Sequence, residues 1–197
     1  MPKPAKTDPS GELPDARPDE GLMRVWDPLV RLFHWSLVAV FSVAWLSSDL
    51  SEAVHMWAGY AAGGLIVLRV IWGLIGPRYA RFSSFVRHPR AVAAYLGDIR
   101  RGREARHIGH NPAGGAMILA LILALAGTVL TGWMMYTDAY YGVDWVAHLH
   151  GLSAHAALFL VIVHLGGVAL ASLRHRENLV SAMIFGKKRA PGECDVA

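Results

Sequence analysis

Cysteine is almost absent from this sequence. Cys194 is the single cysteine among 197 residues, and no Cys-x-x-Cys-His run occurs. One thiol excludes an intramolecular disulfide framework, an iron–sulfur cluster and a cysteine-rich zinc site, and the missing motif excludes covalently attached c-type haem. What chemistry the chain has must therefore come from other side chains, and ten histidines stand out.

Charge is scarce as well. Only 17% of the residues are charged and 54% are hydrophobic, whereas soluble domains are about 25% charged. No Lys or Arg occurs between Arg31 and Arg69, or between Arg106 and Arg174. These tracts predict a membrane protein. The formal charge of +4 does not predict a nucleic-acid partner, because the basic residues flank apolar tracts.

Four stretches are long and apolar enough to cross a bilayer, which takes about 20 residues. They cover residues 29–48, 53–75, 114–136 and 146–173. Each should be helical, because backbone polar groups in lipid must be satisfied within their own span. We therefore expect an all-α membrane protein, with a four-transmembrane-helix bundle over residues 24–176. Residues 1–23, which contain no signal-like apolar run, are expected to be a disordered cytoplasmic tail, and residues 177–197 a cytoplasmic C-terminal tail.

Basic residues predict the orientation. The loop 77–112 contains eight arginines, and the flanks of the first and last spans carry further Lys and Arg. The other two loops contain Asp49, Glu52, Asp138 and Asp144 but no Lys or Arg. Both termini and the long loop should face the cytoplasm. Within that loop, residues 91–103 have the spacing of an interfacial amphipathic helix.

Histidines within the spans are candidates for function, because ionisable groups in lipid are costly. His34 lies early in the first span, His55 opens the second, and His150 and His164 lie on the fourth. At about 100° and 1.5 Å per residue, His150 and His164 share a face and are roughly 21 Å apart. His150 can then meet His55 near the outer surface, while His164 meets His34 near the inner one.

Two imidazoles at each level suit a haem with two axial ligands. Zinc requires three or four ligands, and the spans offer no buried carboxylate or thiolate. Copper held by imidazole alone would lack a supporting Met or Cys. Two non-covalent, bis-histidine b-type haems inside the bundle are therefore the expected cofactors.

The other six histidines fit this scheme less well. His148 and His155 point away from the shared face, while His88, His107 and His175 lie in arginine-rich cytoplasmic segments. His110 has two open interpretations: it caps or steers the entry to the third span, or it touches a cofactor edge. Arg69, 14 residues beyond His55, either pairs with a haem propionate or extends to the inner interface.

Several segments together resemble the prokaryotic cytochrome b561 family, which overlaps with the cytochrome b subunits of membrane-bound nickel–iron hydrogenases. They are RVWDPLVRLFHW, HMWAGY, LRVIWGLIGPRYARF, GHNPAGG and the His-x13-His of the fourth span, and the resemblance covers residues 24–189. It implies a four-helix, di-haem cytochrome of a bacterial inner membrane that moves electrons between the quinone pool and an outer-face partner. By motif position the resemblance implies His34, His55, His150 and His164 as haem ligands and places Arg69 near a haem.

The favoured hypothesis is electron transfer between ubiquinone or menaquinone and a c-type cytochrome or oxidoreductase subunit. Two alternatives are also redox functions. The first is a superoxide:quinone oxidoreductase, which the acidic outer loops disfavour. The second is a hydrogenase cytochrome b subunit, from which this chain differs in being short and in having compact outer loops. A metal transporter or scaffold is disfavoured by the lack of buried carboxylates. Whether the chain is itself an enzyme, and whether it forms a homo-oligomer, stays open.

Overall fold

The computed structural model describes residues 22–190, 192 and 195–196. Four long helices dominate it: α1 (Pro28–Ser47), α2 (Glu52–Ile75), α5 (Pro112–Met134) and α6 (Asp144–Arg174). All four are long and apolar enough to cross a membrane. They differ from the predicted spans by no more than two residues at any end. The expected four-helix transmembrane bundle is confirmed.

Polar caps decide where three of these helices begin. The side chain of Asp27 accepts from the N–H of Leu29 at the start of α1, and Ser51 accepts from Val54 at the start of α2. Asn111 accepts from the N–H of Gly114 at 2.6 Å to begin α5. Proline follows Asp27 and Asn111 at the first helical position, where its missing N–H does no harm.

The four spans pack as two helical hairpins joined along one side. The hairpins are α1 with α2 and α5 with α6, and α2 packs against α5 between them, whereas α1 and α6 are not a closely packed pair. Ile66, Leu125 and Ala157 form a buried apolar cluster at mid-height. Most other apolar side chains of the spans are exposed, as expected for surfaces that face lipid.

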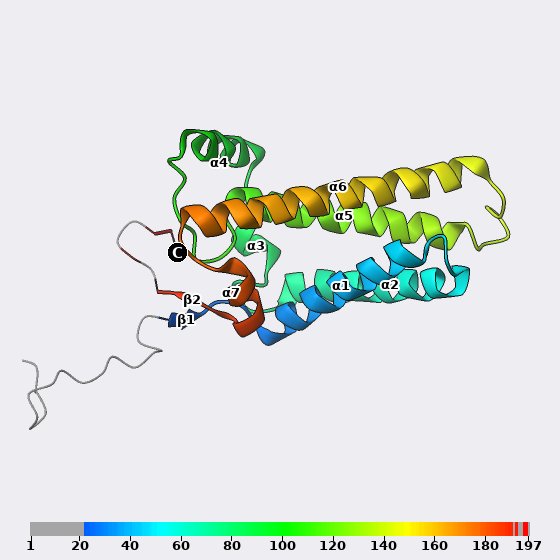
Figure 1. Cartoon of the computed structure of the whole chain (residues 1–197), viewed down its shortest axis with the longest axis horizontal. Coiled ribbons are helices and arrows are strands. Elements are labelled where there is room, and N and C mark those ends of the chain that lie inside the picture. Colours follow the sequence, from blue (N-terminus) through cyan, green and yellow to red (C-terminus); the bar gives the residue numbers. More distant parts are fainter. Residues whose placement is uncertain (1–21, 191, 193–194, 197) are drawn as a thin grey trace, which may run out of the picture.

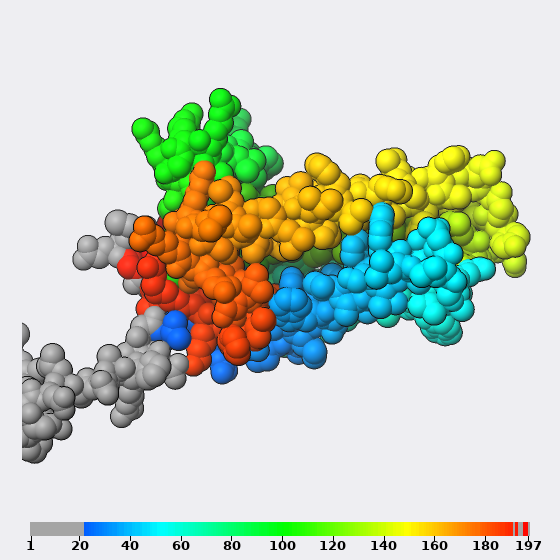
Figure 2. Space-filling view, viewed as in Figure 1, coloured from blue at the N-terminus to red at the C-terminus, as the bar shows by residue number. Residues whose placement is uncertain are grey.

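The two ends of the bundle differ, and Figure 1 shows them at opposite sides. The end formed by the α1–α2 and α5–α6 connections is called the loop end. The opposite end, called the terminal end, carries the short elements α3 (Phe82–Phe85), α4 (Pro89–Arg101), α7 (Leu179–Phe185), β1 (Leu22–Arg24) and β2 (Lys187–Arg189). The helix expected over residues 91–103 is thus present as α4, which forms a separate prominence at this end (Figure 2).

Part of what the sequence suggests to be tail is folded. β1 and β2 pair antiparallel, with Leu22 opposite Arg189. Residues 1–21 lie outside the described residues, but residues 22–23, 179–185 and 187–189 belong to regular elements of the terminal end. The expectation missed this because strands of only three residues, Leu-Met-Arg and Lys-Lys-Arg, are too short to show a hydrophobic alternation.

Candidate functional site: two histidine pairs in the bundle

Four intramembrane histidines meet in two pairs at different heights. Near the loop end, the ring of His55 on α2 faces that of His150 on α6, with centroids 6.0 Å apart and planes at 81°. Toward the terminal end, His34 on α1 faces His164 on α6 with centroids 6.5 Å apart and planes at 56°. We call these the loop-end pair and the terminal-end pair. The buried cluster of Ile66, Leu125 and Ala157 occupies the middle of the bundle.

Both rings of the loop-end pair are fixed by backbone acceptors. Nδ1 of His55 lies 2.8 Å from the carbonyl oxygen of Ala44, and Nδ1 of His150 lies 2.9 Å from that of Thr128. Only a protonated Nδ1 can donate to a carbonyl, so both rings carry their hydrogen there. Nε2 of each ring is then an unprotonated nitrogen, which is the form that binds a metal.

The terminal-end pair has a different environment. Nδ1 of His34 is buried and has no hydrogen-bond partner. Its ring contacts Trp35 edge-on, with centroids 5.2 Å apart. Among the described residues, no hydrogen bond holds the ring of His164. The two levels of the bundle therefore hold their histidines in unlike ways.

The spacing of each pair suits a flat macrocycle with an axial ligand on each side. Metal–nitrogen bonds of about 2 Å on both sides, plus roughly 1 Å from each nitrogen to its ring centre, give a centroid separation of about 6 Å. Both observed separations are close to this value. No group of three or more His, Cys, Asp or Glu side chains gathers among the described residues, so a zinc-type donor set is not found there. The residues present fit haem.

Arg69 lies at the terminal end of α2 and is almost fully buried, with 4% of its surface exposed. Its Nη1 donates to the carbonyl of Ala80 at 3.1 Å, and its guanidinium lies 5.0 Å from the ring centre of Phe82 and 6.0 Å from that of Phe85. The guanidinium is therefore enclosed by protein groups and is not exposed to solvent. The short helix α3 covers the side chain, an arrangement that the sequence did not suggest.

His110 is enclosed by aromatic rings. Its ring centroid lies 4.6 Å from that of Trp26 and 4.8 Å from that of Phe85, and its buried Nδ1 has no hydrogen-bond partner. Burial, together with the positive charges of Arg69 and Lys188, lowers the pKa of His110 to about 3. The ring is therefore neutral at physiological pH. Asn111, and not His110, caps α5.

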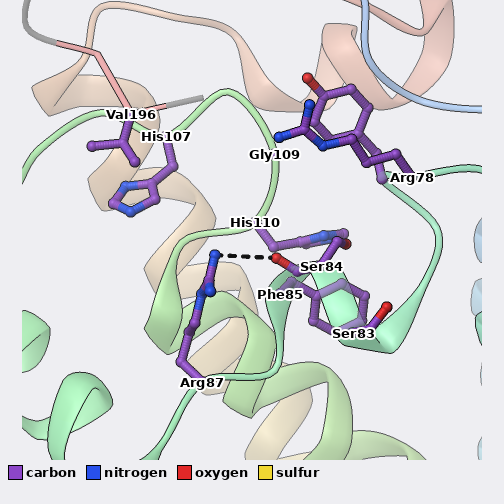
Figure 3. Close-up of a pocket in the computed structure, with 10 residues that line it drawn as sticks. Arg78, Ser83, Ser84, Phe85, Arg87, His107, Gly109, His110 and Val196 are labelled. Carbon is purple, nitrogen blue, oxygen red and sulfur yellow. Dashed lines mark hydrogen bonds between the residues drawn. The ribbon is translucent and has the colours of Figure 1, made fainter.

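His110 also lines a cavity of about 220 Å³ at the terminal end (Figure 3). Arg78, Arg87 and His107 line the same cavity. Arg87 donates to the carbonyl of Ser84 at 3.3 Å, the contact dashed in Figure 3. The residues that line the cavity thus include two arginines and no carboxylate.

The remaining histidines are not brought into either pair. Nδ1 of His155 donates to the carbonyl of Gly151 one turn earlier at 2.7 Å, and its ring contacts Trp45 edge-on. His148 is exposed. His88 caps α4 by accepting from the N–H of Arg90, and His107 packs edge-on against Tyr95.

Sequence reasoning missed the groups that hold the loop-end pair. They are the carbonyls of Ala44 and Thr128 and the hydroxyl of Thr131, which lies 3.3 Å from Nδ1 of His150. Carbonyl acceptors are present at every residue, so sequence carries no signal for them. The threonines did carry one: two hydroxyls three residues apart interrupt the otherwise apolar third span.

Known proteins resemble this chain over most of its length. Three relatives carry the name "Probable Ni/Fe-hydrogenase B-type cytochrome subunit". The one from Bradyrhizobium diazoefficiens is 25% identical over 92% of this chain and 91% of its own length. Those from Rhodobacter capsulatus and Rhizobium leguminosarum bv. viciae are each 24% identical over 83% of this chain, covering 80% and 87% of their own lengths. No solved structure matches.

The family model described as prokaryotic cytochrome b561 matches residues 25–186. That range contains all four spans and both histidine pairs. The chain belongs to the prokaryotic cytochrome b561 family, and is a B-type membrane cytochrome.

Proposed function

We propose that this chain is a di-haem electron-transfer cytochrome in which the loop-end pair and the terminal-end pair each ligate one b-type haem. The observation that carries the proposal is the coincidence of two histidine pairs, 6.0 and 6.5 Å between ring centroids, at two heights of one transmembrane bundle. Family membership supports haem as the cofactor. The proposed number of two haems follows from the presence of two histidine pairs.

The chain's own residues hold and insulate the redox sites. Haem supplies reversible one-electron transfer. His55 and His150 present Nε2 because their Nδ1 atoms are committed to carbonyls. Two histidine ligands on one iron would leave no open coordination position, so binding of dioxygen at the metal is not expected. The buried guanidinium of Arg69 would offer positive charge for a propionate of the haem at the terminal-end pair.

We propose that the terminal end faces the cytoplasm. Arginines concentrate there, in α4 and the segments around it, whereas the loop-end connections contain no Lys or Arg. The loop end would then face outward and present the exposed carboxylates of Asp49, Glu52, Asp138 and Asp144. Such a surface suits a partner with a basic docking face.

The partner is proposed to be a redox protein at the loop end that exchanges electrons, through this chain, with membrane quinone. The names of the relatives favour a nickel–iron hydrogenase. The chain covers 80–91% of the relatives' lengths, so its shortness no longer separates it from hydrogenase subunits. A c-type cytochrome remains the second candidate, supported by the acidic loop end. Oxidation of superoxide is disfavoured by the same acidic surface, which repels anions.

Sealed membrane vesicles can test direction and orientation together. In right-side-out vesicles, the impermeant donor hexaammineruthenium(II) should reduce the cytochrome rapidly when added outside, and in inside-out vesicles slowly. His150→Ala should remove this fast reduction because it removes a ligand of the haem nearest the donor. A quinol should reduce the cytochrome in vesicles of either orientation. Faster reduction of inside-out vesicles contradicts the orientation, and fast reduction by superoxide that superoxide dismutase abolishes would favour the superoxide alternative.

A further inference from the structure

His150 rests in a notch on α5 formed by three residues within one turn. Its Nδ1 lies 2.9 Å from the Thr128 carbonyl and 3.3 Å from the Thr131 hydroxyl oxygen. A Cβ on Gly132 would stand 3.0 Å from Cε1 of His150 and 3.2 Å from its Nδ1, closer than most real contacts. Glycine at position 132 therefore lets the imidazole approach the helix closely enough to reach both oxygens.

The hydroxyl of Thr131 has a defined role in this notch. It donates to the carbonyl of Gly127 at 2.7 Å and lies 3.1 Å from that of Thr128. Its hydrogen is thus committed to its own helix, and its lone pairs are left for the N–H of His150. That N–H is shared between the Thr128 carbonyl and the Thr131 oxygen. Thr131 is 4% exposed, so water does not compete for the contact.

The opposite ligand candidate is held in the same manner by a different helix. Nδ1 of His55 donates to the carbonyl of Ala44 at 2.8 Å, near the end of α1. At the terminal-end pair, Nδ1 of His34 has no partner. An imidazole whose N–H donates to a strong acceptor becomes a more basic, more electron-donating ligand. Stronger donation stabilises the oxidised iron and lowers the midpoint potential.

Fixed charge acts in the same direction. The buried guanidinium of Arg69 lies at the terminal end of α2, where positive charge favours the reduced, less positive state of a nearby haem. Exposed carboxylates surround the loop end, and no Lys or Arg occurs in its connections. The hydrogen bonds and the fixed charges therefore both favour a lower midpoint potential at the loop-end site than at the terminal-end site.

Resting on the proposed function, we propose that Thr131, with Gly132 and the Thr128 carbonyl, positions His150 as a haem ligand. Together with the Ala44 carbonyl that holds His55, this seat gives the loop-end haem a lower midpoint potential than the terminal-end haem. Electrons that enter at the loop end then move energetically downhill toward the terminal end. Thr131 is a positioning residue, because it acts through His150.

Redox titration of the purified, haem-loaded protein tests this, monitored by visible absorption and by low-temperature electron paramagnetic resonance. The loop-end haem is identified as the one whose signal His150→Ala removes, and it should titrate at the lower potential. Thr131→Val keeps the side-chain shape without the hydroxyl, so it should raise that potential and shift the resonance of that haem, or lose that haem alone. Thr131→Ser should restore wild-type behaviour.

Thr137→Val is the matched control. It makes the same substitution at a hydroxyl that donates only to the carbonyl of Met134, at 2.7 Å, just beyond the end of α5. It should leave both potentials unchanged. The inference is overturned if Thr131→Val changes neither signal, if Thr137→Val shifts the loop-end haem as much, or if the loop-end haem titrates higher. A wild-type protein without haem would instead contradict the proposed function.

Discussion

His150 and His155 share a helix and differ in what their rings reach. His150 faces His55 across the bundle, whereas His155 donates to a carbonyl of its own helix and contacts Trp45. A five-residue offset on α6 turns the second ring through about 140° from the first. Two histidines about 7.5 Å apart along one helix therefore face different neighbours.

Replacing these two side chains separates their roles. His150→Ala should lower the haem content from two to one per chain, because the loop-end haem loses one of two axial ligands. His155→Ala is the control and should keep both haems. Pyridine haemochrome assays on purified protein measure the ratio. Loss of haem from His155→Ala together with full content in His150→Ala would show that the ligand was assigned to the wrong histidine.

The sequence predicted depth and face for the paired histidines because both follow from residue counting along a straight helix. It could not predict the seat of His150, since that depends on how α5 is rotated against α6. Arg69 shows the same limit of prediction from sequence. Its depth followed from its spacing along α2 from His55. The rings of Phe82 and Phe85 that cover it could not be predicted, because their position depends on where a short helix folds back.

Among the elements, the terminal end is held by a buried ionic cluster. Arg106, before α5, donates from Nη2 to Glu177 at 2.8 Å and also pairs with Asp195. Lys188 on β2 lies 3.4 Å from Glu177 and donates to the carbonyls of His107 and Ile108. Arg106, Glu177 and Lys188 have side chains exposed by 8% or less. The cluster therefore fastens the segment after α6 to the loop before α5.

This cluster predicts a pH dependence. Burial alone would raise the pKa of Glu177, but the hydrogen bond from Arg106 and the charge of Lys188 outweigh it and hold that pKa below its ordinary value of 4.5. A lowered pKa in the folded state stabilises the fold above the ordinary pKa, and the contribution disappears as pH falls through the lowered value. Hydrogen exchange in β2 should be slow at pH 7 and, after correction for intrinsic rates, accelerate below about pH 4.5.

Glu177→Gln should release β2 even at neutral pH. Buried cations that lose a partner destabilise by about 3–5 kcal/mol, and even the lower figure corresponds to roughly 100-fold faster exchange. Asp98→Asn breaks the exposed pair between Asp98 and Arg101 on α4 and should change exchange in β2 little. Equal exchange in wild type and Glu177→Gln would show that the cluster does not fasten β2.

Strands β1 and β2 are elements that the sequence failed to predict, and they exist through a long-range contact. β1 pairs with β2 across more than 160 residues of chain, and neither strand has a pattern that specifies a partner. The N-terminal caps of α1, α2 and α5, in contrast, are local, and residues such as Asp27 and Asn111 are typical cap residues that can be recognised in the sequence. Local chemistry is readable from one segment, but pairing between distant segments is not.

At the scale of the whole molecule, the bundle has two features that are each unfavourable in a membrane: imidazoles within the spans and two helices that are not closely packed. Imidazoles within spans lose hydration, and α1 and α6 are not closely packed against each other along their length. A macrocycle held between facing histidines would offset both, since it supplies bonds for the rings and apolar surface for the helices. On the proposed function the cofactor would complete the fold, and we expect protein made without haem to be less stable.

Haem stoichiometry tests the central claim most directly. The purified full-length chain should give two haems per polypeptide by pyridine haemochrome assay and b-type bands in the reduced-minus-oxidised spectrum, because each histidine pair holds one macrocycle. One haem per chain would show that one of the pairs, 6.0 or 6.5 Å between ring centroids, has another role. No haem in protein produced with adequate haem supply would contradict the assignment of both pairs.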